Sequence, residues 1–395
     1  MIFKQNNPYF VIENFINTKR GLFIALIIGK LILLPFLLYF AAKFDPRDFN
    51  ILILPDLIKY EDTKSLLNLF DTNNFSPSLG FLILASLIKL LSNTELIKYI
   101  FYGFISITIM TFSQTLLLHK IIQLKKDSSI FLKSSAIFFS IINFYILIYS
   151  IKPSSDVFGC LSIVILFLGL IKYQNKDDYY KGSILWILSL LVLSLFRNNL
   201  FIVFPFLIFT NAFKCFIQEI KENNKKTNLI FFIILSFLII LNLYQFLGYL
   251  VLYKYDQENG GLLTNLFNNA NENLIQRLFY FFLIFIKKIL FLISARESIA
   301  INNYDYFIAQ NTTLFNYPSL INIGTALYLF LTNFLGLLSI NTKFNISFRN
   351  TFLFILIPLI PLLSYWTHHR YFLAYSLFTN ACLPFLFEKN RSLKK

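Results

Sequence analysis

Runs of apolar residues long enough to cross a lipid bilayer recur along this chain of 395 residues. About 20 helical residues cross the hydrocarbon core. Five runs reach this length: Gly21–Ala42, Ile97–His119, Ile130–Ile151, Asn228–Tyr253 and Ser319–Ile340. Hydrophobic residues make up 57% of the chain and charged residues only 14%. A soluble domain of this size does not bury so much apolar surface, so we expect an all-α polytopic integral membrane protein.

Shorter apolar runs complete the expected set of crossing helices: Val157–Tyr173, Gly182–Phe196, Asn199–Phe213, Thr351–Trp366 and Tyr371–Phe387. Two further runs are ambiguous, because Ser78–Leu91 is too short to cross and Leu278–Ser294 contains two adjacent lysines. We interpret both as helices that lie in the plane of the membrane surface or re-enter it. The sequence thus predicts about ten transmembrane helices, within a range of ten to twelve, in a single membrane-embedded domain covering residues 1–395.

The distribution of charge predicts the orientation. With ten crossings, the segments on the side of both termini carry 19 Lys and Arg against 7 Asp and Glu, whereas the opposite segments carry 13 of each kind. Lys and Arg accumulate in cytoplasmic loops, so both termini are expected in the cytoplasm, with a first outer loop at 43–96 and a second at 254–318. The same rule explains the net charge of +15 without nucleic acid. We expect an integral protein of a bacterial inner (plasma) membrane.

The first expected outer loop concentrates acidic residues. Seven of the twenty carboxylates of the chain fall between Asp45 and Glu95. Carboxylates beside a membrane span are costly to desolvate and usually have a function. Asp56, Glu61 and Asp62 are therefore candidate catalytic residues, although each could equally be a solvated loop charge.

Three short turns on the same expected side each place a cation beside polar groups. The candidate substrate-binding residues there are Lys152, Asp156, Arg197, Asn198, His368, His369, Arg370 and Tyr371. Lys and Arg are the usual partners of phosphate, and the phosphate of a lipid carrier sits at this depth. Two plainer interpretations stay open: Arg197 as an interfacial anchor, and the His-His-Arg turn as a polar helix cap. Adjacent histidines on one helix face different ways, so the pattern predicts no metal site.

Several of these segments together resemble the GT-C glycosyltransferases, in particular the mannosyltransferase-like members. The resemblance rests on the loop with Asp56 and Tyr60, and on four short stretches: 75–84, Ser150–Asp156, Leu195–Asn199 and His369–Phe372. It implies a polytopic enzyme that uses a polyprenyl-phosphate-linked sugar and carries its catalytic acid in the first outer loop. The loop lacks the Asp-x-Asp of that group and has only Glu61-Asp62, so a requirement for a divalent cation stays open. No C-terminal soluble domain is expected.

The expected reaction is transfer of a sugar from a polyprenyl-phosphate donor to a lipid, glycan or protein acceptor at the outer face, with inversion. A carboxylate, Asp56 as first choice, would accept the proton of the acceptor hydroxyl. Arg370 and Arg197, supported by Lys152 and His369, would stabilise the departing phosphate. Tyr60 would stack on the sugar or hydrogen-bond to it. The expected partners are the lipid-linked sugar and membrane lipids, and the oligomeric state stays open.

Two other classes of function remain as alternatives. An O-antigen or exopolysaccharide polymerase or ligase would also act on lipid-linked sugars, but the 254–318 loop holds only two arginines, Arg277 and Arg296. A lipid-linked glycan flippase or other transporter would be expected to carry broken helices and polar residues near the membrane midplane. Only Lys30, Lys98 and Lys133 stand out as charges within the apolar runs. The sequence therefore favours the glycosyltransferase.

Overall fold

The computed structural model describes residues 8–44, 79–91, 94–151, 156–174, 179–196, 274–276, 278, 317–356 and 373–388. In these ranges the chain is helical and contains no strand. The helices are α1 (Pro8–Ile16), α2 (Lys19–Phe44), α5 (Leu79–Leu91), α6 (Glu95–Leu124), α7 (Ile130–Ile142), α8 (Phe144–Ile151), α9 (Asp156–Gln174), α10 (Tyr179–Phe196), α17 (Tyr317–Lys343), α18 (Ile346–Leu356) and α19 (Leu373–Cys382), followed by the 3₁₀ helix η8 (Leu383–Phe387). The expected all-α class is confirmed for this part of the chain.

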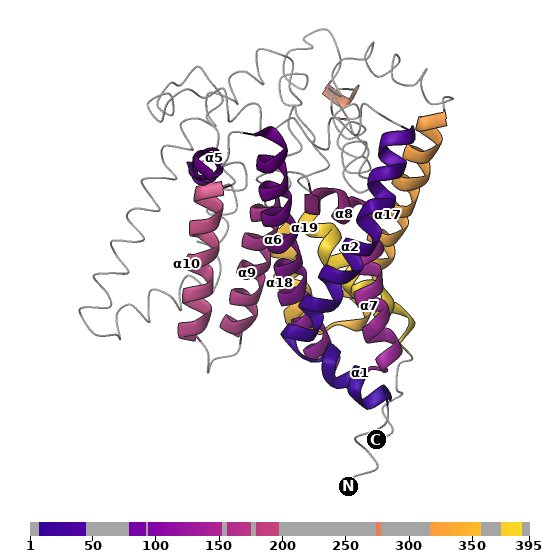
Figure 1. Ribbon diagram of the computed structural model, residues 1–395. Helices are drawn as coiled ribbons and strands as arrows, with labels where there is room; N and C mark the ends of the chain where they lie inside the picture. The colour runs from indigo at the N-terminus through magenta and orange to yellow at the C-terminus, as the bar shows by residue number, and fades with distance from the viewer. Residues whose placement is uncertain are drawn as a thin grey trace, which may run out of the picture.

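Most of the long helices run along one common direction and form a bundle (Figure 1). The end of α6 and the start of α7 lie at the lower end of the bundle, joined by a short turn (Figure 1). We call this end of the bundle the basal end, and α1 lies there as well (Figure 1). Helix α5 lies at the opposite end, above α10, and is seen along its own axis while α10 runs upright (Figure 1). It therefore lies across the bundle direction, as expected for a helix of 13 residues that does not cross.

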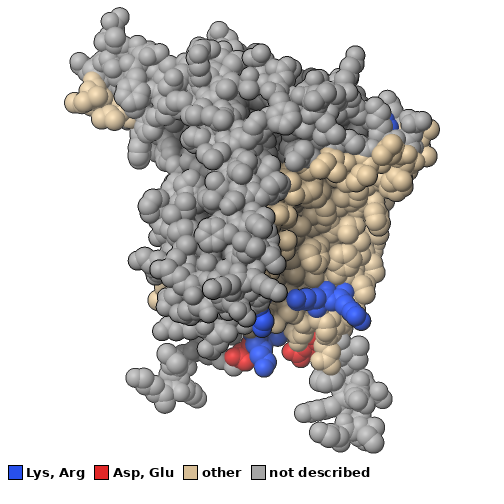
Figure 2. Space-filling model, turned by 90° about the vertical axis from the view of Figure 1, so that its left-hand side faces the viewer, with Lys and Arg blue, Asp and Glu red and all other residues tan. Residues whose placement is uncertain are grey.

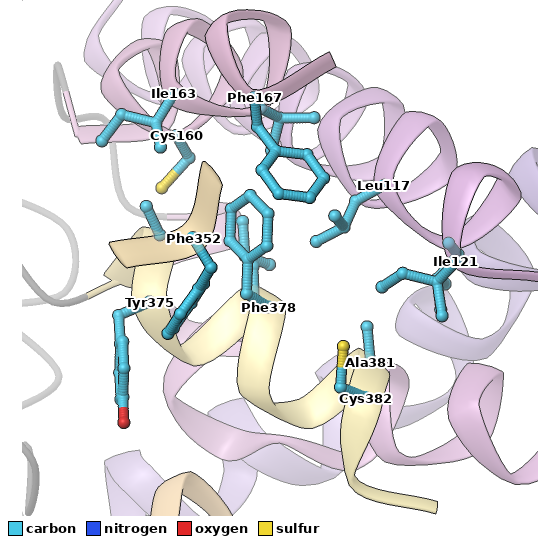
Figure 3. Close-up of a cluster of buried hydrophobic side chains, with 14 of the residues drawn as sticks. Leu117, Ile121, Cys160, Ile163, Phe167, Phe352, Tyr375, Phe378, Ala381 and Cys382 are labelled. Carbon is cyan, nitrogen blue, oxygen red and sulfur yellow. The ribbon is translucent and has the colours of Figure 1, made fainter. Parts of the chain in front are cut away.

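The core is centred on α19, in which all ten residues are buried. Phe378 of α19 packs edge-to-face against Phe167 of α9, with 4.7 Å between ring centroids (Figure 3). Phe167 packs in the same way against Phe348 of α18 at 4.9 Å. A helix whose residues are buried on every side, the polar Ser376, Thr379 and Asn380 included, must be surrounded by other parts of the chain. The end of the chain thus fills the middle of the bundle.

Small and hydroxylic residues let two helix pairs approach closely. Ser162 of α9 and Ser189 of α10 each donate to the backbone carbonyl of the other residue, at 2.7 and 2.8 Å. In the second pair, Gly336 of α17 lies against the backbone of Thr379 in α19, and Thr379 donates to Asn333 Oδ1 at 2.7 Å. Such contacts are typical of helices that associate without a strong hydrophobic driving force between them.

The prediction of one continuous helix over Ile130–Ile151 is wrong. The chain breaks at Asn143, whose extended backbone (φ −64°, ψ 105°) ends α7. The Asn143 side chain then accepts a hydrogen bond from the backbone amide of Ile146 at 3.1 Å. This is the geometry of an N-cap, for which asparagine is a preferred residue. The run therefore contains two short helices joined by a capped break.

The other expected crossing segments that are described are helical, with shifted ends. By length and composition, Ile100–Leu124 in α6 is the only helix of the described ranges that is long and apolar enough to cross a membrane. Ile130–Ile142, Ile184–Leu193 and Leu373–Phe387 are shorter apolar helices. Asn199–Phe213, Asn228–Tyr253, most of Thr351–Trp366 and nearly all of Leu278–Ser294 lie outside the described residues. The count of ten crossings stays a prediction.

Candidate functional site at the α5 end of the bundle

Asp156 is the one candidate site residue that falls within the described ranges. The other candidates lie outside them: Asp56, Tyr60, Glu61, Asp62, Lys152, Arg197, Asn198, His368, His369, Arg370 and Tyr371. The helix ends next to three of the predicted segments are described: α5, the start of α9 and the end of α10.

Asp156 is the first residue of α9 and is only 3% exposed. A carboxylate at this position interacts favourably with the amide dipoles of the first helical turn. The sequence interpretation placed Asp156 in a surface turn that contacts substrate, whereas the structure buries it. Burial alone does not decide whether this carboxylate contacts substrate, so its role in binding stays a prediction.

The ends of α9 and α10 meet through an aromatic stack. Phe158, two residues after Asp156, lies parallel to Phe196, with 3.9 Å between ring centroids and 3° between ring planes. Phe196 is the last residue of α10 and directly precedes the predicted Arg197-Asn198 turn. The stack thus brings the start of α9 and the end of α10 together at one end of the bundle.

Helix α5 packs on this aromatic stack. Gly80 faces Phe196 and the backbone oxygen of Leu195 so closely that an added Cβ would lie 2.8–2.9 Å from them. Ile88 of α5 packs in one buried cluster with Tyr102 of α6 and Phe158. The second part of the stretch 75–84, which carries part of the family resemblance, therefore lies in α5. This helix packs against the end of α10 and near the starts of α6 and α9.

Lys98 is a residue of this region that the sequence interpretation did not assign to the site. It is 8% exposed and lies one helical turn before Tyr102, on the same face of α6. Tyr102 in turn packs with Phe158. The signal in the sequence was a lysine four residues before a tyrosine at the start of an apolar run, a pattern too common to single out alone. A buried cation and a buried carboxylate thus belong to this end of the bundle.

No group of three or more His, Cys, Asp and Glu side chains within the described ranges could hold a metal ion. The acidic residues of the first outer loop lie outside these ranges, so the question of a divalent cation rests on the sequence alone.

A second polar region lies inside the bundle, between α2, α6 and α7. Lys30 is fully buried and donates to Thr111 Oγ1 at 3.1 Å. One turn along α6, Gln114 donates to the backbone oxygen of Ser140 at 2.8 Å, while its own Oε1 has no hydrogen-bond partner among the described residues. Within the same ranges, the side-chain amide nitrogen of Asn143 at the helix break is likewise buried without a partner. Buried polar atoms of this kind are rare and usually mark function or strain.

A third polar cluster closes the basal end. Lys125, just after α6, forms an ion pair with Glu388 at 2.7 Å and also donates to the backbone oxygen of Lys343. Ser128 donates to the same carboxylate. Partial burial by itself raises the pKa of the Glu388 carboxyl, but the hydrogen bonds from Lys125 and Ser128 and the positive charges of Lys125 and Lys343 outweigh it, so the pKa lies below its ordinary value. This clamp ties the α6–α7 turn to the ends of α17 and η8.

No known protein family matches the chain, and neither does any characterised protein or solved structure. Function must therefore be argued from the residues and their arrangement.

Proposed function

We propose that the protein is a membrane-embedded glycosyltransferase of the GT-C type that transfers a sugar from a polyprenyl-phosphate carrier to an acceptor at the outer face of the membrane. The observation that supports this most is the packing of α5, the start of α9 and the end of α10 against one another at one end of the bundle. Gly80 and Phe158 both lie against Phe196, and these helix ends border the stretches in which the sequence predicts the site. Carboxylates and cations needed for one reaction must share such a region.

The proposed orientation places the basal end in the cytoplasm and the α5 end outside, in a bacterial inner membrane with ten crossings. Most visible charged side chains of the described surface lie at the basal end, beneath an area that shows few charged side chains (Figure 2). The positive-inside rule favours this orientation. The run Ile100–Leu124 would be one of the crossings.

In the proposed reaction the acceptor oxygen attacks the anomeric carbon of the sugar. The new carbon–oxygen bond forms as the bond to the carrier phosphate breaks, and the bonding pair leaves with the phosphate. Asp56 takes the proton of the acceptor hydroxyl, and Arg197 and Arg370 stabilise the charge that develops on the phosphate. A single displacement of this kind inverts the anomeric centre.

The test uses membranes that contain the full chain, a panel of polyprenyl-phosphate sugars and detection of the glycosylated product. Asp56→Asn keeps the size of the side chain but removes its basicity, so activity should fall by about 10²- to 10⁴-fold. Glu61→Gln and Asp62→Asn identify the base if Asp56 is not it. Wild-type activity in all three variants would overturn the mechanism.

A matched pair of variants tests the arrangement of the site. Phe196→Ala removes the ring that holds α5 and α9 together and should lower transfer activity. Phe138→Ala removes a ring of the same size from an exposed position of α7 and should leave activity unchanged. Equal activity of the two variants would separate the aromatic stack from function.

Transport is the second candidate function, and two observations favour it. The helix break at Asn143 and the buried amine of Lys30 are features that transporters use to bind polar substrates within the membrane. Proteoliposomes distinguish the two functions. Movement of a lipid-linked sugar across the bilayer without formation of a glycosylated product, abolished by Lys30→Met, would support transport and exclude the transferase.

A further inference from the structure

Buried polar side chains meet inside the bundle where α2 and α6 face the break between α7 and α8. Lys30 of α2 donates to Thr111 Oγ1 of α6 at 3.1 Å. Gln114 follows Thr111 by one turn on the same face of α6, and it donates to the backbone oxygen of Ser140 at 2.8 Å. Asn143, one turn beyond Ser140, forms the break. These two hydrogen bonds connect α2 through α6 to the end of α7.

Lys30 and the break also lie at a similar height above the basal end. At a rise of about 1.5 Å per residue, Lys30 lies about 16 Å from the start of α2 and Asn143 about 20 Å from the start of α7. Gly29, next to Lys30, packs against Ile141, since an added Cβ would lie 2.6 Å from that side chain. Helix α2 also contacts α8 beyond the break, and the four helices lie beside one another in Figure 1. Lys30 and Asn143 therefore belong to one buried region.

The amine of Lys30 has no counter-charge among the described residues. It is fully buried, and its one hydrogen bond within these ranges goes to the neutral hydroxyl of Thr111. The ion pairs of the described ranges join other residues at the basal end. An ammonium group that is buried in a membrane bundle without a partner is strongly unfavourable, whereas a paired one is tolerated.

The start of α8 supplies further hydrogen-bond donors to this region. Asn143 is fully buried, and its Oδ1 accepts from the backbone amide of Ile146, so its Nδ2 lies beside the first turn of α8. This Nδ2 is buried and has no hydrogen-bond partner among the described residues. The remaining amides of the first turn have no acceptor within the helix, and the helix dipole makes this end positive. An amine, an amide nitrogen and a helix N-terminus together favour a bound anion.

We propose that the region between Lys30 and Asn143 binds a small monovalent anion of the size and charge of chloride. The anion supplies the counter-charge of Lys30 and accepts hydrogen bonds from Asn143 Nδ2 and the start of α8. A dianion would carry more charge than one amine neutralises, and a large organic anion does not fit among side chains that are fully buried. Gln114 Oε1 is an acceptor and does not contact the anion; a water molecule bound to the anion would donate to it.

Thermal unfolding of the purified full chain in neutral detergent, followed by tryptophan fluorescence, tests the site. Chloride is compared with the much larger gluconate at constant ionic strength. At a chloride concentration ten times its dissociation constant, the unfolding midpoint of the wild type should be about 3 °C higher than in gluconate. Lys30→Met should show no such shift. Glycosyl transfer and transport are not the readout, so the result is independent of the proposed function.

Two variants distinguish loss of the anion from other effects. Asn143→Asp keeps an oxygen that caps Ile146 and places a carboxylate oxygen where Nδ2 was, so the protein carries its own counter-charge for Lys30. Its midpoint should be the same in chloride and in gluconate. Lys126→Met is the matched control, because it removes an exposed lysine at the basal end, and it should keep the wild-type shift.

The absence of a chloride shift in the wild type, or an equal shift in Lys30→Met, would overturn the proposal. A full shift in Asn143→Asp would overturn it as well, since the start of α8 would then not contact the anion. In gluconate, Lys30→Met should be more stable than the wild type, and chloride should narrow this difference. If Lys30→Met does not fold, the comparison of Asn143→Asp with Lys126→Met decides the question.

Discussion

Gly336 is the position at which one added carbon should most disturb the packing of the bundle. An alanine Cβ there would lie 2.3 Å from the backbone oxygen of Thr379 and 2.6 Å from its Cβ. Non-bonded carbon atoms prefer separations of about 3.5–4.0 Å, so α17 and α19 would have to move apart by about 1 Å. The obstacle is backbone, which cannot rotate away as a long side chain would.

The cost of Gly336→Ala can be worked from this geometry. Overpacking in a well-packed interior costs about 1–3 kcal/mol. Asn333 and Ser339 lie one turn to either side of Gly336. Separation of α17 from α19 would weaken the hydrogen bond from Thr379 to Asn333 and the one from Ser339 to the backbone oxygen of Cys382. Each such bond contributes about 0.6 kcal/mol in a membrane bundle. Replacing a helical glycine by alanine returns about 1 kcal/mol. We expect a net loss of about 2 kcal/mol in the free energy of unfolding.

The assay is unfolding of the purified protein in mild detergent, followed by tryptophan fluorescence, since Trp186 is buried in the core. Gly169→Ala is the control: its added Cβ would lie 3.1 Å from the backbone oxygen of Gly182, a tight contact that a small shift relieves. Gly336→Ala should unfold well before Gly169→Ala. Wild-type stability of Gly336→Ala, or a greater loss in Gly169→Ala, would refute the packing argument.

Four further outcomes are expected. Ser189→Ala removes one of two reciprocal bonds to Ser162 and should lower the free energy of unfolding by about 1 kcal/mol, as measured in the same assay. Because the pKa of Glu388 is lower in the folded protein than its ordinary value of 4.5, the ionised carboxylate stabilises the fold above that pH, and this stabilisation is lost as the pH falls through the folded pKa. Glu388→Gln should therefore make the free energy of unfolding depend less on pH in acid. An unchanged dependence would contradict the ion pair of Glu388 with Lys125. The buried amine of Lys30 makes one hydrogen bond, and Lys30→Met puts an apolar side chain of similar length in its place. The variant should therefore raise the midpoint of unfolding in the same assay, and a lowered midpoint would show that the amine stabilises the fold. The proposed orientation places Lys126 in the cytoplasm, so Lys126→Cys should react with a membrane-impermeant thiol reagent only in opened cells. Labelling of this cysteine in intact cells would contradict the proposed orientation.

The sequence alone predicted the helical class and the approximate positions of most helices. Long apolar runs with polar turns between them carry this information locally, and α6, α9, α10 and α17 begin and end within a few residues of the expected positions. The short helix within Ser78–Leu91 also followed from local properties, because the apolar run there ends after 14 residues; its place in the plane of the membrane stays a prediction. The break at Asn143 was missed because the apolar run continues across it, and a single polar residue inside such a run is a weak signal.

Only the tertiary structure decided which helices meet. Nothing in the local pattern shows that α19 occupies the centre of the bundle, that Phe158 stacks on Phe196, or that Asp156 is buried rather than open. These features depend on contacts between residues far apart in the chain, and many apolar helices of similar composition could exchange places without changing the sequence pattern. The sequence selects candidate carboxylates and cations by residue type, whereas the packing of α5, α9 and α10 determines which of their segments lie at the same end of the bundle.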